Sequence, residues 1–417
     1  MDPSQQTVST NGTTAPAQSP MSVKLQKDSR YYIFLVVYLV LLSALGSFVN
    51  DMYTPALPSM CRFFGCSIPT AQMGMTMGMV GLALGQLILG PVSDRYGRKP
   101  VLIGALTLFI VSAVVSVFSP TIHIFNLCRL FQGIGASGGY FLARTIPADV
   151  YSGRSLARLM ALVGAINGIA PASAPVIGGF TADAFGWRGV FVVLAIFAAV
   201  ILAVVPEMKE SLSPSRRVTG GIRQSILGYK SLILNKPFII HVCFKGTALG
   251  LLFAYISSSP FILQNHYGMT QTGYGLLIGF NALFMAAGSM VALKFKPLKK
   301  AAFTGSLILA AGVVGEAVAL YCIHSIVIYE IFTILIVFAL GLIFTTANTL
   351  AMNEGRSQAG EASSVLGISG YVVGAIVSPL VGLGNVLHST AITYVILTVV
   401  IILFSLASRS LAPDLDK

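Results

Sequence analysis

The sequence predicts an all-α membrane protein with twelve transmembrane helices in two pseudo-symmetric six-helix bundles. Three observations predict this fold class. The composition is 55% hydrophobic and only 10% charged, with a mean hydropathy of +0.83, whereas soluble proteins carry roughly 25% charged residues. Apolar runs of helix length recur twelve times along the 417 residues. The longest interior break between runs falls after the sixth, so it divides the chain six and six.

Each apolar run has about the length of 20 residues that a bilayer-crossing helix needs. The runs are rich in Leu, Ile, Val, Ala, Gly and Phe and lack the roughly ten-residue alternating segments of a membrane β-barrel, so helices are predicted. Charge clusters and turn residues separate neighbouring runs. In chain order the runs cover residues 31–52, 70–91, 101–119, 122–143, 158–182, 187–206, 237–262, 273–293, 302–322, 325–350, 362–385 and 389–409.

The runs and the breaks between them predict five segments. Residues 1–30 are rich in Ser, Thr, Gln and Pro and are expected to be a flexible cytoplasmic tail. Residues 31–206 form the N-terminal bundle, 207–236 a basic cytoplasmic linker, 237–409 the C-terminal bundle and 410–417 a cytoplasmic tail. No cleavable signal peptide is expected before the first run, so that run should remain a span. No break is long enough for a soluble domain.

The basic residues predict the orientation of the chain in the membrane. With the N-terminus in the cytoplasm, Arg62 and Arg188 fall on the outer side, and Arg129 and Lys245 fall within spans. The other twenty-two of the 26 Lys and Arg lie on the cytoplasmic side, in segments 24–30, 95–99, 144–158, 209–236 and 294–300 and at positions 356, 409 and 417. This asymmetry follows the positive-inside rule and places both termini in the cytoplasm. The net charge of +12 therefore reports topology, and no nucleic acid partner is expected.

A weak internal repeat in the sequence supports a duplicated architecture. The second run ends in GPVSDRYGRKPVL and the eighth ends in ALKFKPLKKAAF, so matching positions in the two halves carry basic cytoplasmic turns. Internal symmetry of this kind, with a basic linker between the halves, is typical of a two-bundle transporter.

Four ionisable residues at the spans require an explanation, because such groups cost at least about 2.5–3.5 kcal/mol to insert. Arg129 either acts on a nearby carboxylate or an anionic group, or forms a structural pair. Lys245 either faces the transport path or snorkels to the cytoplasm. Glu316 is either a protonatable group or a packed neutral acid. Asp51 ends the first span, where a coupling role and a helix-end cap are both consistent with its position.

The remaining motifs exclude several kinds of site. No metal-ligand cluster, nucleophile and base pair, or GxxxxGK[ST] phosphate loop occurs, so neither an enzyme nor ATP-driven transport is predicted. The glycine-rich stretches at 133–139 and 174–179 indicate close helix packing within the membrane. Cys61 and Cys66 share one short loop and would pair only if that loop faces an oxidising compartment.

Three segments carry motifs of a known family. Gly90 to Pro100, GPVSDRYGRKP, resembles the loop signature of the major facilitator superfamily between helices two and three. Leu127 to Ala136, with Arg129, resembles the helix-four motif of its proton-coupled members. Pro171 to Gly179 resembles the helix-five antiporter motif, although Ala174 stands where glycine is usual.

Two further segments are similar to one group within that superfamily, the bicyclomycin and chloramphenicol resistance type of drug:proton antiporters. Asn50 to Pro58, NDMYTPALP, is similar to that group's DMYLPALP segment, and Ala359 to Ser364, AGEASS, is similar to its AGxASA segment. The resemblance extends from about residue 31 to residue 409. It leaves out the N-terminal tail and the central linker.

The resemblance implies proton-coupled efflux of small amphipathic compounds or drugs across the bacterial inner membrane. The implied protein is a monomer that works by alternating access, needs no cofactor and uses the proton gradient as its energy source. Its partners are a small-molecule substrate and the lipid bilayer. A proton-coupled importer or metabolite transporter on the same fold is the alternative, because fold fixes neither direction nor cargo.

The resemblance also assigns residues to roles. The proton-coupling candidates are Arg129 and Asp51, to which the buried position of Glu316 adds a third. The implied conformational clamp consists of Gly90, Asp94, Arg95, Gly97, Arg98 and Asp149. The antiporter motif contributes Pro175, Gly178 and Gly179, and Gly164 and Gly168 extend the pliable helix. Helices 1, 4, 7 and 10 line the cavity of such proteins, so the candidate substrate contacts are Tyr38, Gln132, Tyr140, Lys245, Phe253, Tyr255, Phe338 and Asn348.

Overall fold

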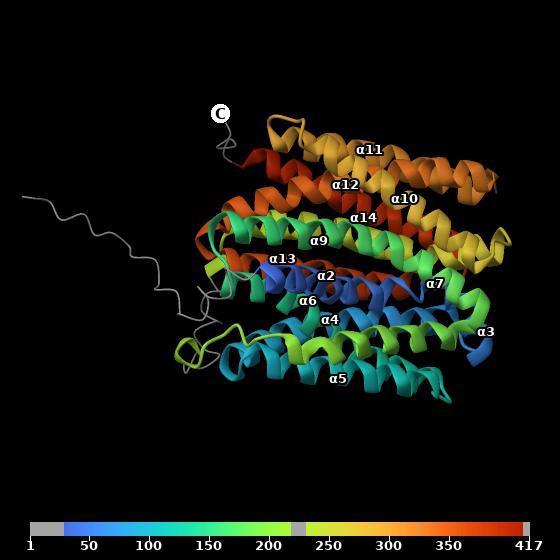
Figure 1. Cartoon of the computed structure of the whole chain (residues 1–417). Helices are drawn as coiled ribbons and strands as arrows, with labels where there is room; N and C mark the ends of the chain where they lie inside the picture. The colour runs from blue at the N-terminus through green and yellow to red at the C-terminus, as the bar shows by residue number, and fades with distance from the viewer. Residues whose placement is uncertain (1–28, 218–230, 324, 412–417) are drawn as a thin grey trace, which may run out of the picture.

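The computed structural model describes residues 29–217, 231–323 and 325–411, and within these ranges every regular element is helical. The predicted N-terminal tail lies almost entirely outside the described residues, as do residues 218–230 of the predicted linker and residues 412–417 of the segment 410–417. Figure 1 shows the long helices packed side by side, with the turn that carries α3 at one end of the molecule.

The N-terminal half contains six spans in five helical runs. Gly186 has φ +69° and ψ −179° and interrupts the last long helix, which therefore contains spans five and six. A single 3-10 turn joins the first helix to a short helix that completes the first span. In order the elements are α2 (Ser29–Asp51), η1 (Thr54–Ala56), α3 (Leu57–Phe64), α4 (Ile68–Tyr96), α5 (Arg98–Val117), α6 (Ile122–Val150), α7 (Gly153–Val204), η2 (Val205–Glu207) and η3 (Pro214–Arg216).

The C-terminal half contributes the other six spans. Two of its helices, α9 and α11, continue into short π-helical segments. In order the elements are α9 (Lys236–Pro260), η4 (Phe261–His266), α10 (Gln271–Ala292), α11 (Leu298–Val318), η5 (Ala319–Ile323), α12 (Ile326–Glu354), η6 (Arg356–Gln358), α13 (Ala359–Leu380) and α14 (Val386–Ser410).

Twelve spans follow from these helices. Ten helical runs among the described residues are long and apolar enough to cross a membrane. That number counts α7 once and omits α6, whose mean hydropathy is lowered by Asn126, Arg129 and Gln132. When α6 is included and the two parts of α7 are counted separately, the predicted twelve-helix all-α fold is confirmed.

Each half has a hydrophobic core, and the core of the N-terminal half also includes Phe253, Phe261 and Ala375 from across the interface. Large apolar side chains such as Phe180, Leu283 and Met290 are exposed, as expected for a surface that faces lipid. We call the end of the molecule with the α4–α5 turn and residues 294–300 the basic end, and the opposite end, with α3, the α3 end.

The two halves pack together through α4 against α13 and through α7 against α10. Hydrogen bonds join them in the half of the molecule nearer the α3 end. Gln72 Nε2 donates to Ser257 O at 2.9 Å, Thr76 Oγ1 to Ala375 O at 2.8 Å, Gln264 Nε2 to Pro55 O at 2.8 Å, and Thr272 N to Asp183 Oδ2 at 2.8 Å. The structure is therefore closed at the α3 end.

Candidate functional site

Arg129 lies about two turns into α6 and is completely buried. Its Nη1 donates to Gln132 Oε1 at 2.5 Å, and its Nη2 donates to Val49 O at 2.5 Å and to Asn50 Oδ1 at 3.2 Å. The guanidinium carbon lies 4.3 Å from the centre of the Tyr53 ring. All of these groups are neutral. Among the described residues no carboxylate lies within 4.0 Å of this charge, so dipoles and a ring face hold it in place.

Gly78 in α4 makes room for this arginine. A Cβ atom at this position would lie 2.5 Å from Asn50 Oδ1 and 2.9 Å from Arg129 Nη2. Any side chain at residue 78 would therefore displace the guanidinium group. The alternating Met and Gly residues of α4 were the only sequence signal for this contact, and they also suit ordinary helix packing.

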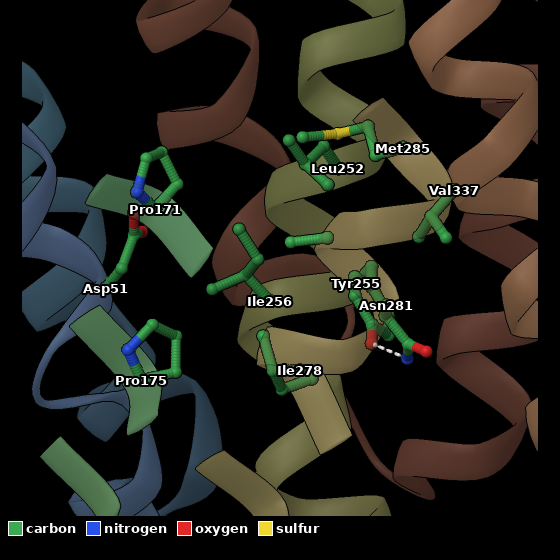
Figure 2. A pocket seen from close by; sticks show the side chains of 11 residues that line it. Asp51, Pro171, Pro175, Leu252, Tyr255, Ile256, Ile278, Asn281, Met285 and Val337 are labelled. Atoms are coloured by element: carbon green, nitrogen blue, oxygen red, sulfur yellow. Dashed lines mark hydrogen bonds between the residues drawn. The ribbon is translucent and has the colours of Figure 1, made fainter. Parts of the chain in front are cut away.

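Asp51 ends α2 beside Asn50 and is buried, with 7% of its surface exposed. It interacts electrostatically with Arg129. The residue lines a cavity of about 50 Å³ between the two halves (Figure 2), which has room for a few water molecules at about 10–15 Å³ each. Asp51 is the acid among the lining residues, so the carboxylate faces this cavity.

The rest of the cavity wall is mostly apolar. Pro171 and Pro175 of α7 lie on the side of Asp51, and Tyr255 and Asn281 supply the polar groups of the opposite wall (Figure 2). Asn281 Nδ2 donates to Tyr255 Oη at 2.9 Å. The other lining residues are Leu252, Ile256, Ile278, Ala282, Met285 and Val337.

Of the predicted substrate contacts, Tyr255 lines this cavity, and Gln132 accepts a hydrogen bond from Arg129. Two others lie outside it. Tyr38 Oη donates to Ile201 O at 3.4 Å, inside the core of the N-terminal bundle. Phe338 packs against Ala292, Ala301 and Leu342 between α10, α11 and α12. The predicted contact Phe253 packs against Tyr371 of α13, with 6.1 Å between the ring centres.

The remaining predicted contacts lie nearer the basic end. Lys245 Nζ donates to Asn348 Oδ1 at 2.9 Å. Tyr140 accepts a hydrogen bond from Arg144, whose guanidinium also lies over the Tyr140 ring. Arg144 and Lys245 interact electrostatically although they belong to opposite bundles. Two positive charges close enough to act on each other favour an anionic group between them.

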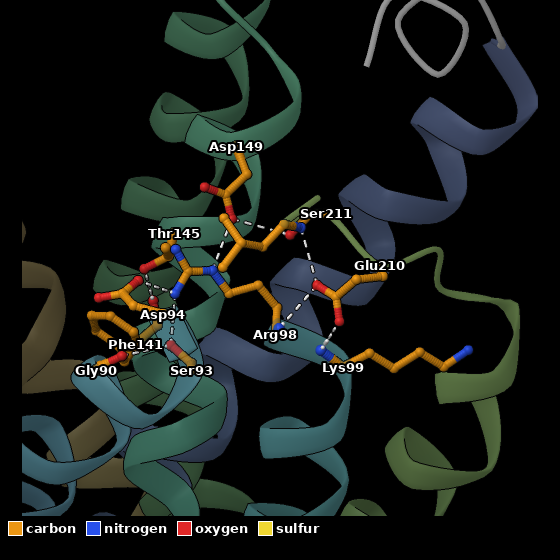
Figure 3. A network of polar contacts seen from close by, with 11 residues as sticks. Gly90, Ser93, Asp94, Arg98, Lys99, Phe141, Thr145, Asp149, Glu210 and Ser211 are labelled. Atoms are coloured by element: carbon orange, nitrogen blue, oxygen red, sulfur yellow. Dashed lines mark hydrogen bonds and ion pairs between the residues drawn. The ribbon is translucent and has the colours of Figure 1, made fainter. Parts of the chain in front are cut away.

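The predicted clamp is built around Arg98 (Figure 3), which is 4% exposed. Its Nη1 donates to Asp94 Oδ1 at 2.5 Å and to Ser93 Oγ at 2.7 Å, and its Nε donates to Asp149 Oδ2 at 2.8 Å. The structure thus brings Asp94, Arg98 and Asp149 together. Arg95 lies outside the group, because its exposed guanidinium lies over the Tyr96 ring.

Glu210, just after the sixth span, completes this clamp, and the sequence did not predict its role. Glu210 Oε1 and Oε2 accept from the backbone N–H groups of Arg98 and Lys99 at 2.9 and 3.1 Å. An acid at the N-terminus of α5 is favoured by the helix dipole. Gly97 has φ +102°, and a Cβ there would lie 2.7 Å from Glu210 Oε2. At Gly90 a Cβ would make only ordinary contact with Phe141, at 3.5 Å.

Replacing Asp149 with asparagine should destabilise the protein more than the same change at Asp94. The Asp149 and Arg98 side chains are 9% and 5% exposed, whereas Asp94 is 41% exposed. Breaking a buried charged hydrogen bond costs about 1–3 kcal/mol, and an exposed ion pair contributes about 1 kcal/mol or less. Thermal unfolding of the purified variants measures the order. Both changes should also slow the conformational cycle, and unchanged transport rates in both variants would contradict the clamp.

The antiporter motif packs α7 against two partners. A Cβ at Gly178 would lie 1.7 Å from Met52 O, just after α2, and one at Gly179 would lie 2.5 Å from Gln271 O of α10. At Gly164 and Gly168 a Cβ would meet nothing within 4 Å. The motif glycines therefore permit close backbone contacts at the α3 end, and the earlier glycines of α7 do not.

The sequence leaves the pairing of Cys61 and Cys66 open, and in this structure both thiols are free. Cys61 Sγ donates to Cys66 O at 2.8 Å, and burial raises the pKa of the Cys66 thiol. The third proton-coupling candidate, Glu316, lies in α11, where its Oε2 accepts from Thr333. It does not line the Asp51 cavity.

Comparisons with known proteins agree with this architecture. The family model of the Major Facilitator Superfamily matches residues 39–379. The MFS-type transporter YdgK of Bacillus subtilis is 32% identical over 357 residues, which are 84% of this chain and 89% of that protein. The multidrug resistance protein MdtL of Shigella dysenteriae is 28% identical over 372 residues, which are 87% of this chain and 93% of that protein.

Two solved transporters share the fold at low sequence identity. A bacterial homologue of the human lysosomal transporter Spinster has a TM-score of 0.77 at 14% identity and covers 93% of this chain and 100% of its own. The xylose transporter XylE of E. coli has a TM-score of 0.72 at 16% identity, with 93% and 99% covered. The chain therefore belongs to the Major Facilitator Superfamily and is a multi-pass membrane transporter, not an enzyme.

Proposed function

We propose that the protein exports small amphipathic compounds in exchange for protons, as an antiporter of the bicyclomycin and chloramphenicol resistance type. The observation that carries the proposal is Asp51, which lines the cavity between the two bundles and interacts electrostatically with the buried Arg129. Arginine remains charged and cannot carry the proton, whereas a carboxylate can bind and release one. The multidrug resistance protein MdtL, to which the chain is similar along 87% of its length, supports a drug-like cargo.

The basic end faces the cytoplasm in this proposal, because Lys and Arg concentrate there. Both termini are then cytoplasmic, and the closed α3 end faces the outside of a bacterial inner membrane. Substrate reaches the protein from the cytoplasm in this state. Protons reach Asp51 from outside after the α3 end opens, as alternating access requires.

The contacts around Asp51 connect its protonation to the closed end. An ionised Asp51 is attracted by Arg129, and that attraction is lost when the carboxyl group is neutral. The next residue, Met52, has its carbonyl against Gly178, and the neighbouring Gly179 lies against α10. A shift at the end of α2 therefore reaches the interface between α7 and α10. Protonation of Asp51 in the open state can bias this bistable contact and return the α3 end to the closed state.

Replacing Lys245 with glutamine should lower the export of anionic compounds and leave neutral compounds little changed. Lys245 and Arg144 place two positive charges on the path near the basic end, and removing one weakens the attraction for an anion. We expect a change of about tenfold, or 1.4 kcal/mol. Efflux of matched anionic and neutral dyes from cells measures the selectivity. Equal losses of efflux for both dyes would show that Lys245 does not select substrates by their charge.

Everted membrane vesicles test the proposed exchange. Respiration acidifies their lumen, so adding a transported drug to the outside should partly collapse the pH gradient. The panel should include chloramphenicol, norfloxacin and ethidium, and vesicles with Asp51→Asn serve as the control. If no drug changes the gradient and cells instead take up one nutrient through this protein, the chain is an importer and the proposal is wrong.

A further inference from the structure

Two acids lie in the C-terminal bundle, apart from the Asp51 site: Glu316, which is buried, and Glu330, which is partly buried. Glu316 of α11 is 1% exposed. Its Oε2 accepts from Thr333 Oγ1 at 3.4 Å, and its Oε1 is buried without a hydrogen-bond partner. Glu330 precedes Thr333 by three residues on α12, so the two side chains share one face of the helix. Both carboxylate oxygens of Glu330 are also buried, with the Asn281 side chain beside them but no hydrogen bond of normal geometry, and the two acids interact electrostatically.

The titratable groups that face Glu316 are tyrosines and the second acid. Tyr329 and Glu330 come from α12, Tyr394 comes from α14, and Tyr267 follows η4. Two histidines belong to the neighbouring elements and are held in ring contacts: His266 with Tyr267, and His388 with Tyr321 of η5. Among the described residues, no Lys or Arg is one of the groups that act on Glu316.

These surroundings favour neutral acids. An ionised carboxylate only accepts hydrogen bonds, whereas a protonated one also donates. Two ionised acids that repel each other, without a cation acting on Glu316, would each cost several kcal/mol to bury. The unpartnered atoms of the two acids are acceptors, and so is the buried Oδ1 of Asn281, which lies beside Glu330. Protonation of Glu330 supplies a donor where acceptors are in excess.

Asn281 connects the acid pair to the central cavity. Its Nδ2 donates to Tyr255 Oη at 2.9 Å, and both residues form the wall opposite Asp51 (Figure 2). The Tyr255 hydroxyl both donates and accepts. The Tyr255 hydroxyl on the cavity wall is therefore one side chain, Asn281, away from Glu330.

We propose that Glu316 and Glu330 form a second proton-binding site in the C-terminal bundle, next to the wall of the Asp51 cavity that Tyr255 and Asn281 form. Each carboxylate takes one proton from water and becomes a neutral acid, and no other bond changes. The proposal rests on the proposed function only in treating the proton as the coupling ion. With acids in both bundles, protonation acts on both sides of the interface that opens and closes.

Infrared difference spectroscopy during a pH titration tests the site without any substrate. The full-length protein in lipid should show the carbonyl stretching band of protonated carboxyl groups, and the Asp51→Asn variant should retain part of it. Glu316→Gln and Glu330→Gln should each remove intensity from that remaining band. Glu354→Gln changes an exposed acid at the other end of α12 and is the matched control, with a band equal to that of the parent.

The outcomes are distinct. A band that is unchanged in both Glu316→Gln and Glu330→Gln overturns the proposal. Loss of the band when sodium chloride replaces choline chloride at constant pH also overturns it, because the site would then bind a metal cation. Thermal unfolding checks that each variant is folded, and the less buried Glu330 serves if Glu316→Gln does not fold. If no drug is transported and the band still titrates, the proposed function fails while the proton site stands.

Discussion

The Arg129→Ala variant is expected to lose proton-coupled transport by at least 100-fold, or about 2.7 kcal/mol, while it remains folded. Truncation removes the charge that acts on Asp51 and leaves Val49 O, Asn50 Oδ1 and Gln132 Oε1 without their donor. The protein should still insert and fold, because the removed charge has no carboxylate within ion-pair distance in the described structure and its burial is itself costly. Drug efflux and the collapse of the pH gradient in vesicles are the measurements.

Two further variants separate the charge of Arg129 from its position. Arg129→Lys keeps the charge, but a single ammonium group does not match the planar guanidinium that reaches three acceptors at once. A loss of about tenfold is expected. Gly78→Ala keeps the arginine and places a methyl group 2.9 Å from Nη2, so it should impair coupling without removing any charge. Full transport by Arg129→Ala would refute the assigned role.

A single methyl group at residue 179 is expected to prevent closure of the α3 end. In Gly179→Ala the added Cβ would lie 2.5 Å from Gln271 O and 3.0 Å from Thr272 Cα. Both atoms belong to the backbone of α10, so neither can move aside as a flexible side chain would. The helices α7 and α10 must separate, and transport should fall to near background.

Cysteine labelling measures this change of conformation. In a variant whose five native cysteines are replaced by serine, Asn281→Cys reports access to the cavity. Gly179→Ala should increase its labelling by a membrane-impermeant maleimide added from outside. Gly168→Ala is the matched control, because a Cβ at that position of the same helix meets nothing within 4 Å. If both substitutions give the labelling rate of the parent, the close contact does not hold the end shut.

Patterns that depend on local sequence were sufficient for the fold and for part of the clamp. Apolar runs, basic turns and the motif from Gly90 to Pro100 predicted the twelve spans and placed Asp94 and Arg98 in one group. The motif did not separate Arg98 from Arg95, although one is buried and the other exposed. That difference depends on Asp149 and Glu210, which reach the loop from distant parts of the chain.

The cavity residues show a different limit of prediction from the sequence. The cavity was predicted from the helices that line it in this superfamily, but successive residues of a helix point about 100° apart. The neighbouring Val337 lines the cavity where Phe338 was expected, and Tyr38 faces the core of its own bundle. Glu330 was not predicted as a site residue because it lies in a run whose composition is that of an ordinary apolar span. The rotation of each helix is set by packing between distant segments.

The central claim is that proton entry drives export through Asp51, and purified protein in proteoliposomes tests it most directly. The substrate is the drug that gives the largest collapse of the pH gradient in everted vesicles, and the protein is oriented with its basic end outward. With an acidic lumen, the parent protein should accumulate the drug inside and Asp51→Asn should not. Accumulation only with an alkaline lumen, or equal accumulation by Asp51→Asn, would contradict the account.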